Sequence, residues 1–266
     1  MTALVRNPGG GGEGYIPVTR IGEPEADTGI EFGILKLGAG VRHDCTSPRE
    51  GAWVLLNGEL EVTLGGERHR VGRESLFDQP PVVLHLARGT EASLRGRIES
   101  ELAVVQVENP AGFAPMLFGP GNMLADDHRG LGQLDDTAYR LVRTVFDLRN
   151  RPESRLVLGE VVNLPGRWSS YPPHHHPQPE IYHYRFTAPQ GYGHAELGET
   201  VIKVRHGDTV KILDGRDHPQ VAAPGYGMFY IWAIRHLPGQ PYTVPEFTEA
   251  HRWLNDPEAK YWKPRR

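Results

Sequence analysis

The chain of 266 residues carries 29 Lys and Arg residues against 33 Asp and Glu residues, a formal net charge of -4 at pH 7. The two signs are interspersed, so neither a nucleic acid nor an anionic membrane is an expected partner. No stretch approaches the roughly 18 apolar residues of a spanning helix, and no apolar leader segment is present, which predicts a cytoplasmic protein. Cys45 is the only cysteine, so no internal disulfide can form.

Turn-forming residues dominate the spacing of the chain. The 32 Gly and 23 Pro exceed average usage, and short apolar runs follow one another without a long segment of helical periodicity. This pattern predicts an all-β protein built from sandwiches or barrels. Asn57-Gly58 interrupts one alternating run, which predicts a hairpin with a type I′ turn there. The expected strands cover residues 30–37, 52–56, 59–64, 81–86, 101–107, 155–162, 181–186, 191–197, 200–204, 208–213 and 228–234.

Residues 109–136 are rich in Gly and Pro and read as the joint between two lobes. We therefore expect a first lobe over residues 1–110, a linker over 111–136, a second lobe over 137–237, and a tail over 238–266 that wraps the surface.

The most informative stretch lies in the second lobe. His174 and His176 are separated by one residue, so on an extended chain both imidazoles project to the same face. Glu180 follows a Pro-Gln-Pro turn at the start of an apolar run, and His218 follows a Gly turn before another. Three imidazoles and one carboxylate suit one divalent ion per chain, with positions left open for substrate. Zn or Mn is the expected ion, with Fe, Co and Ni as alternatives. The alternative interpretation is that the three histidines are a surface run without a metal-binding role.

The order His-x-His, x3-Glu, Gly-x2-His resembles the double signature of the cupin β-barrel. The first lobe has Thr-Ser-Pro-Arg-Glu over residues 46–50 where a His-x-His would stand, and its histidines His43, His69 and His85 are scattered. We therefore expect a bicupin, two fused jelly-roll barrels with the metal site in the C-terminal barrel only.

The segment that carries the first three ligands, residues 168–185, is called the metal stretch below. It resembles the 5-deoxy-glucuronate isomerase family, which is related to the 5-keto-4-deoxyuronate isomerases. The shared motifs are Trp168-Ser-Ser-Tyr-Pro-Pro-His174-x-His176, then Glu180-x-Tyr182, and later His218-Pro219. Weaker similarity covers nearly the whole chain. The resemblance implies conversion of 5-deoxy-D-glucuronate, an aldose uronic acid, to the ketose 5-dehydro-2-deoxy-D-gluconate in myo-inositol catabolism, with a divalent metal in the second lobe.

Aldose to ketose isomerisation moves a proton between adjacent carbons through an enediol, which calls for a metal and a positioned acid or base. Strand alternation from Glu180 places Tyr182 inside with the metal and His183 and Arg185 outside. Tyr182 is the inner candidate as acid, base or hydroxyl-binding group, with a metal-bound hydroxide as the alternative base. Candidates for binding the substrate are Arg185 and Arg129 for its carboxylate and Tyr226 as a wall of the pocket.

Three other functions stay open at this point. The same ligands would serve an Fe(II) cupin dioxygenase, and the short loops around the site leave a different keto or uronic sugar as substrate. A non-catalytic sugar-binding cupin is the third. A homo-oligomer is expected, because fused cupins leave sheet edges that pair readily.

Overall fold

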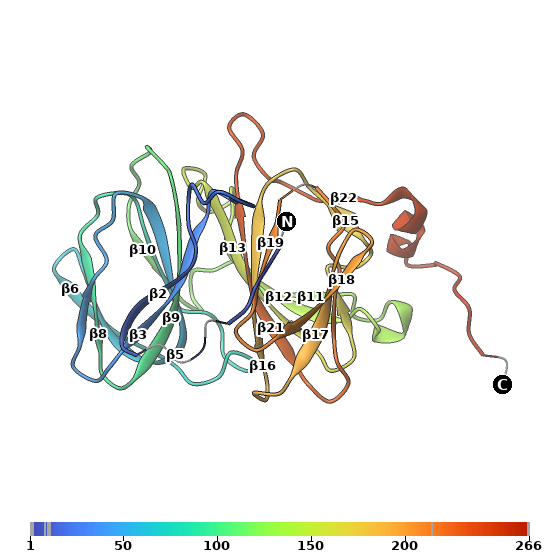
Figure 1. Ribbon diagram of the computed structural model, residues 1–266, viewed down its shortest axis with the longest axis horizontal. Helices are drawn as coiled ribbons and strands as arrows, with labels where there is room; N and C mark the ends of the chain where they lie inside the picture. The colour runs from blue at the N-terminus through green and yellow to red at the C-terminus, as the bar shows by residue number, and fades with distance from the viewer. Residues whose placement is uncertain (1–2, 8, 10–11, 214, 265–266) are drawn as a thin grey trace.

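The structure, a computed structural model, describes residues 3–7, 9, 12–213 and 215–264. Two lobes lie side by side along its long axis, the first half of the chain mostly in one and the second half in the other (Figure 1). Regular structure in these residues is almost entirely β, apart from two short 3-10 helices, η1 (Leu134–Asp136) and η2 (Glu249–Asn255). The expected all-β fold is confirmed.

The first lobe is one branched sheet. Its strands are β2 (Gly14–Thr19), β3 (Glu31–Leu37), β4 (Arg42–Asp44), β5 (Glu50–Leu64), β6 (Glu67–Arg73), β7 (Val83–Leu86), β8 (Ala92–Gly96), β9 (Ser100–Val107) and β10 (Met116–Phe118). The main path runs β10-β7-β5-β9-β3-β2, and the far half of β5 pairs instead with β6 and β8. The long β5 therefore folds the sheet around an apolar interior that contains Trp53, Leu60 and Leu94.

The second lobe consists of a seven-stranded sheet, a four-stranded sheet and a strand pair. Its strands are β1 (Leu4–Val5), β11 (Asp127–Arg129), β12 (Arg140–Phe146), β13 (Leu156–Asn163), β14 (Trp168–Ser169), β15 (His174–His175), β16 (Glu180–Phe186), β17 (Tyr192–Leu197), β18 (Thr200–Arg205), β19 (Thr209–Ile212), β20 (Gln220–Ala222), β21 (Met228–Arg235) and β22 (Glu246–Phe247). The orders are β1-β19-β16-β21-β13-β12-β11, then β14-β20-β17-β18, and β15-β22. One apolar cluster joins the two larger sheets, as in a sandwich.

The two lobes share a hydrophobic core. Ile30 and Phe32 from β3 and its approach, with Val54 of β5, lie in the same cluster as Ile181 of β16 and Phe229 of β21. The seven-stranded sheet is thus covered on one face by the first lobe and on the other by the interior of its own lobe. This explains why all seven residues of β16 are buried. The strand that begins at Glu180 is therefore held from both sides.

The predicted hairpin at Asn57-Gly58 is wrong. β5 continues through both residues, with a register shift against β9 between Leu55 and Asn57 that is a bulge. Gly58 has φ 117, and a Cβ there would lie 2.6 Å from Cα of Ser100, so β9 approaches too closely for a side chain. The actual turn is Gly65-Gly66, both with positive φ, between β5 and β6.

Segments near the ends of the chain join the second lobe. β1 pairs with β19, although the sequence analysis assigned these residues to the first lobe. The expected linker is divided: β10 pairs with β7 of the first lobe, whereas β11 pairs with β12 of the second. The tail does more than wrap the surface, because β22 pairs with β15 and brings residues 242–245 over the interior of the second lobe.

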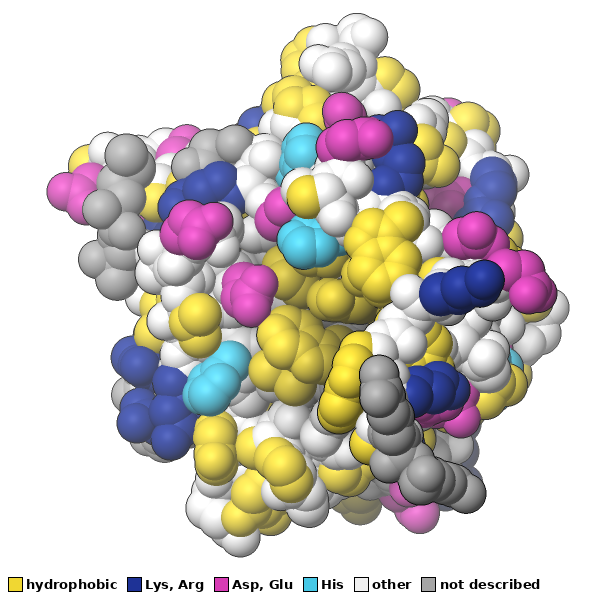
Figure 2. Space-filling model, turned by 90° about the vertical axis from the view of Figure 1, so that its right-hand side faces the viewer, with side chains coloured by type: hydrophobic (Ala, Val, Ile, Leu, Met, Phe, Trp, Pro, Cys, Tyr) yellow, Lys and Arg dark blue, Asp and Glu magenta, His cyan; other side chains and the backbone are white. Residues whose placement is uncertain are grey.

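The described residues contain no helix that is long and apolar enough to cross a membrane. The end of the molecule formed by the second lobe shows hydrophobic side chains gathered near the middle, with charged side chains of both signs around them (Figure 2).

Candidate active site

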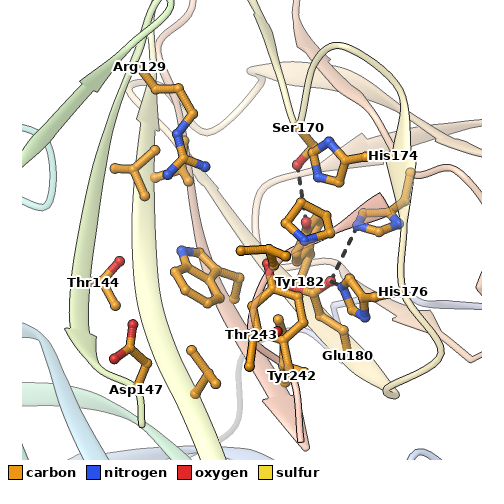
Figure 3. Close-up of a pocket in the computed structure, with 18 of the residues that line it drawn as sticks. Arg129, Thr144, Asp147, Ser170, His174, His176, Glu180, Tyr182, Tyr242 and Thr243 are labelled. Carbon is orange, nitrogen blue, oxygen red and sulfur yellow. Dashed lines mark hydrogen bonds and ion pairs between the residues drawn. The ribbon is translucent and has the colours of Figure 1, made fainter. Parts of the chain in front are cut away.

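A cavity of about 440 Å³ opens in the second lobe. The inner face of the seven-stranded sheet forms one wall, the metal stretch forms another, and residues 242–245 of the tail close it from outside. His174, His176 and Glu180 lie together on one side of this cavity, whereas Arg129 and Asp147 lie on the other side, at opposite ends (Figure 3). The cavity thus sets a cluster of metal-ligating groups opposite charged groups on the sheet edge.

Three of the four expected metal ligands converge. His176, Glu180 and His218 each offer a ligand atom within 4.8 Å of the other two, and all three side chains are buried. Oε2 of Glu180 lies 3.2 Å from Nε2 of His176 and 3.5 Å from Nε2 of His218. Two ligand atoms that each bind one ion at about 2.1 Å lie about 3.0–3.4 Å apart, so the spacing suits a shared divalent ion.

The hydrogen bonds on the far side of each ring decide which nitrogen faces the cluster. Nδ1 of His176 donates to the carbonyl of Gln178 (3.0 Å), and Nδ1 of His218 donates to the carbonyl of Arg216 (2.9 Å). A carbonyl can only accept, so Nδ1 carries the proton and Nε2 presents a lone pair to Glu180. Burial lowers the pKa of His218, which opposes a second proton on that ring. Lone pairs that converge on a carboxylate repel one another unless a cation lies between them. The donor set therefore fits a divalent metal.

His174 stands beside this trio. Its Nδ1 donates to the carbonyl of Pro172 (2.9 Å), as in the other two rings, and its ring centre is 5.3 Å from that of His218. Burial, reinforced by His218, lowers the pKa of His174 to about 3, so the ring is neutral and its Nε2 can also act as a ligand. The structure brings this side chain to the cavity wall but not within the 4.8 Å cluster.

Local sequence explains how these groups meet. A Pro-Gln-Pro turn over residues 177–179 separates His176 from Glu180, the first residue of β16. His218 stands two residues before β20, where Gln220 donates from Nε2 to the His218 carbonyl (2.7 Å). Tyr184 in turn donates to Oε1 of Gln220 (2.5 Å), so the backbone of His218 is fixed to the centre of β16. The ligands are thus positioned by buried bonds rather than by flexible loops.

Tyr182, the expected acid or base, lines the cavity next to the cluster. Its hydroxyl lies 3.1 Å from Oγ of Ser170 and its ring is 5.8 Å from that of His218. Burial and the neighbouring Glu180 raise the pKa of Tyr182 well above its usual value. The phenol therefore stays protonated and can donate a hydrogen bond or a proton.

The expected substrate-binding residues separate in the structure. Arg129 lines the cavity and bonds Asp127 through Nε (3.0 Å) and Nη2 (2.7 Å). Arg185 does not line it: the side chain points toward the first lobe and bonds Glu101 (3.1 Å). Strand alternation places Arg185 on the face of β16 that points away from the metal cluster, as expected. That face is not exposed to solvent but lies in the buried layer between the two lobes. Tyr226 is half-buried against the apolar cluster of the second lobe and also lies off the cavity wall.

Arg140 and Tyr242 are among the cavity residues that the sequence did not point to. Arg140 on β12 is buried and reaches the cavity from the sheet. Arg140, Val142 and Thr144 alternate along β12 and all line the cavity, but Arg143 between them breaks the apolar alternation that marks a strand in the sequence. Tyr242 comes from the tail and packs its ring 4.8 Å from that of His176. No local pattern connects this tyrosine with a histidine 66 residues earlier in the chain.

Known proteins resemble this chain over most of its length. A 5-deoxy-glucuronate isomerase from Geobacillus thermodenitrificans (strain NG80-2) is 26% identical over 244 residues, covering 81% of this chain and 86% of its own length. The enzyme of the same name from Geobacillus kaustophilus (strain HTA426) is 26% identical over 222 residues, covering 76% and 77%.

Solved structures show the same fold. An IolB-like protein from Salmonella typhimurium LT2 superposes with a TM-score of 0.84 at 23% identity, covering 95% of this chain and 99% of that one. Oxalate decarboxylase from Bacillus subtilis gives a TM-score of 0.60 at 11% identity, covering 89% and 76%. The sequence profile of the KduI/IolB family matches residues 4–254. The chain therefore belongs to the KduI/IolB family.

Proposed function

We propose that the chain is a metal-dependent aldose-ketose isomerase that converts 5-deoxy-D-glucuronate to 5-dehydro-2-deoxy-D-gluconate, a step of myo-inositol catabolism. One observation carries the proposal: His176, Glu180 and His218 converge in the cavity of a chain whose relatives are named 5-deoxy-glucuronate isomerase. Family membership supports an isomerase that acts on a small sugar acid.

His176, Glu180 and His218 would hold the metal, and His174 would complete the set from the cavity wall. When bound, a divalent ion such as Zn or Mn supplies a Lewis acid that polarises the oxygens on the two reacting carbons. The carbonyl partners of the three Nδ1 atoms hold each Nδ1 as the protonated nitrogen, so each Nε2 is left free to bind the ion.

The reaction is internally balanced. The carbon next to the aldehyde loses its C–H proton and its hydroxyl proton and becomes a ketone, while the former aldehyde gains one proton on carbon and one on oxygen and becomes an alcohol. No outside oxidant or reductant is required. Tyr182 stays protonated beside Glu180, so we assign it the donor role toward the oxygen on which negative charge develops in the enediol. The hydrogen bond with Ser170 orients its hydroxyl.

The test is proton NMR of 5-deoxy-D-glucuronate incubated with protein loaded with one equivalent of Zn or Mn. Appearance of the ketose, with loss of activity in a chelated sample and in His176→Ala, is the expected result. His194→Ala is the matched control, because His194 is exposed on β17, away from the cavity wall, and should retain full activity.

Failure would be informative. No ketose despite one bound ion per chain would refute this substrate and direct the search to other uronic and keto sugars. Oxygen consumption with Fe(II) would instead identify a dioxygenase.

A further inference from the structure

Three arginines line the cavity, and their partners differ. Arg129 is paired with Asp127, and Arg149 is paired with Asp147, each at 2.7 Å. Arg140 is 4% exposed and donates from Nη1 to the carbonyl of Ala138 (2.8 Å) and from Nη2 to the carbonyl of Tyr171 (3.1 Å). Among the residues that the structure describes, it has no carboxylate partner.

A buried guanidinium without a counter-ion is unusual, because an unpaired buried charge is costly. Burial lowers the pKa of Arg140 to about 10, which still leaves the side chain charged at neutral pH. A guanidinium has five N–H donors, and two neutral carbonyls use only part of this set. The remaining donors and the uncompensated charge suit an anionic group that enters the cavity.

The location of Arg140 relates it to the metal cluster. Its bond to the Tyr171 carbonyl ties it to the segment that enters the metal stretch three residues later at His174. Its charge acts on His174 and also on Tyr230, both of which line the cavity. Arg140 lines the same cavity as His174, His176 and His218.

We propose that Arg140 binds the carboxylate of the sugar acid and thereby fixes which end of the substrate reaches the metal cluster. The proposal rests on the proposed function, because it takes the substrate to be a uronic acid. Five carbon–carbon bonds of about 1.5 Å separate the aldehyde carbon of a hexuronate from its carboxylate, an extended span of about 6 Å. The carboxylate and the reacting carbons are therefore far enough apart to contact different residues of the cavity. A planar guanidinium also matches a carboxylate better than an ammonium does.

The experiment compares an acid and a neutral substrate. Wild-type protein and Arg140→Gln are assayed with 5-deoxy-D-glucuronate and with 5-deoxy-D-glucose, whose terminal CH2OH replaces the carboxylate. We expect Arg140→Gln to lower kcat/KM for the acid by roughly 10- to 100-fold, mostly through KM, and to change the neutral substrate by less than about threefold. Arg149→Gln, a cavity arginine already paired with Asp147, should keep the preference for the acid.

A purely structural role for Arg140 makes a different prediction. If the bond to Tyr171 only supports the metal stretch, both substrates and the bound metal content fall together in Arg140→Gln, and the proposal is overturned. Arg140→Lys keeps the charge without the fork, so it should bind the acid several-fold more weakly with unchanged metal content, even if the Gln variant does not fold.

Calorimetric titration with 5-deoxy-D-glucuronate separates this proposal from the isomerase proposal. Binding that is lost in Arg140→Gln without any turnover by wild-type protein supports the carboxylate site and refutes the reaction. Equal binding by wild type and Arg140→Gln refutes the site whether or not turnover occurs.

Discussion

Replacing Glu160 with Gln should weaken the attachment of the two lobes. Oε1 of Glu160 on β13 accepts from Nη2 of Arg73 (2.6 Å) on β6 and from Nη1 of Arg143 (3.0 Å) on β12, and all three side chains are buried. Arg143 also donates to the carbonyls of Phe77 and Gln79 in the first lobe. The carboxylate is therefore the shared counter-ion of two guanidinium groups where the lobes meet.

The magnitude follows from what is left behind. Gln keeps the shape of Glu160 and one acceptor oxygen, so no cavity forms, but two buried like charges lose their common counter-ion. Removing one partner of a buried ion pair costs about 3–5 kcal/mol. For a chain of this length 1 kcal/mol corresponds to roughly 2 °C, so Tm should fall by about 6–10 °C. The desolvation cost of the two arginines does not enter this difference, because both stay buried in the variant.

Urea unfolding followed by far-UV circular dichroism measures this cost. Both lobes share one hydrophobic core, so we expect a single cooperative transition in wild-type protein. Glu59→Gln is the control, since Glu59 pairs with Arg70 and Arg97 on the surface of the first lobe and should cost no more than about 1 kcal/mol. A cost for Glu160→Gln no larger than that of the control would refute the reasoning.

Three further predictions concern the site and the polar interior. Chelation of bound metal should lower Tm, and one equivalent of Zn or Mn should restore it, because without metal the Nε2 lone pairs of the histidines converge on the Glu180 carboxylate. Scanning fluorimetry measures this change, and a Tm that does not respond to metal would contradict the metal assignment. Tyr182→Phe should lower kcat by roughly 10²-fold or more with little change in metal content, whereas Tyr226→Phe, off the cavity wall, should leave kcat unchanged in the same NMR assay. The free energy of unfolding should decline as pH falls below about 6.5, partly because of His85. Arg151 donates a hydrogen bond to Nδ1 of His85 (3.2 Å), so the neutral ring donates from Nε2 to Glu50 (2.8 Å). Burial lowers the pKa of His85, so the folded protein keeps this ring neutral. The unfolded chain then binds a proton that the folded chain refuses, so His85→Gln should reduce the pH slope by up to about 1.4 kcal/mol per pH unit; an unchanged slope would contradict this.

The sequence predicted best what is decided over short distances. The Pro-Gln-Pro turn between His176 and Glu180 and the Gly turn before His218 are local, and these three side chains meet in the structure. Alternation along β16 also separated Tyr182, in the cavity wall, from Arg185. Period-two patterns and short turns carry this information because each depends on a few neighbouring residues.

Features that depend on distant pairing were not predictable. Asn57-Gly58 has the composition of a hairpin turn, but pairing of β5 with β9 and β6 keeps the strand continuous through a bulge. Arg185 meets Glu101 only because the lobes pack face to face. Tyr242 reaches His176 because β22 pairs with β15. In each case the feature depends on a contact between segments far apart in the chain, and the pattern of neighbouring residues does not contain that information.

Solvent deuterium incorporation tests the central claim most directly. The metal-loaded protein is incubated with 5-deoxy-D-glucuronate in D2O, and the product is examined by proton NMR beside a chelated sample and His176→Ala. An enediol mechanism predicts ketose with one deuterium at the former aldehyde carbon, and no ketose in either control. Ketose without deuterium, or ketose formed equally by the chelated protein, would contradict metal-dependent isomerisation through an enediol.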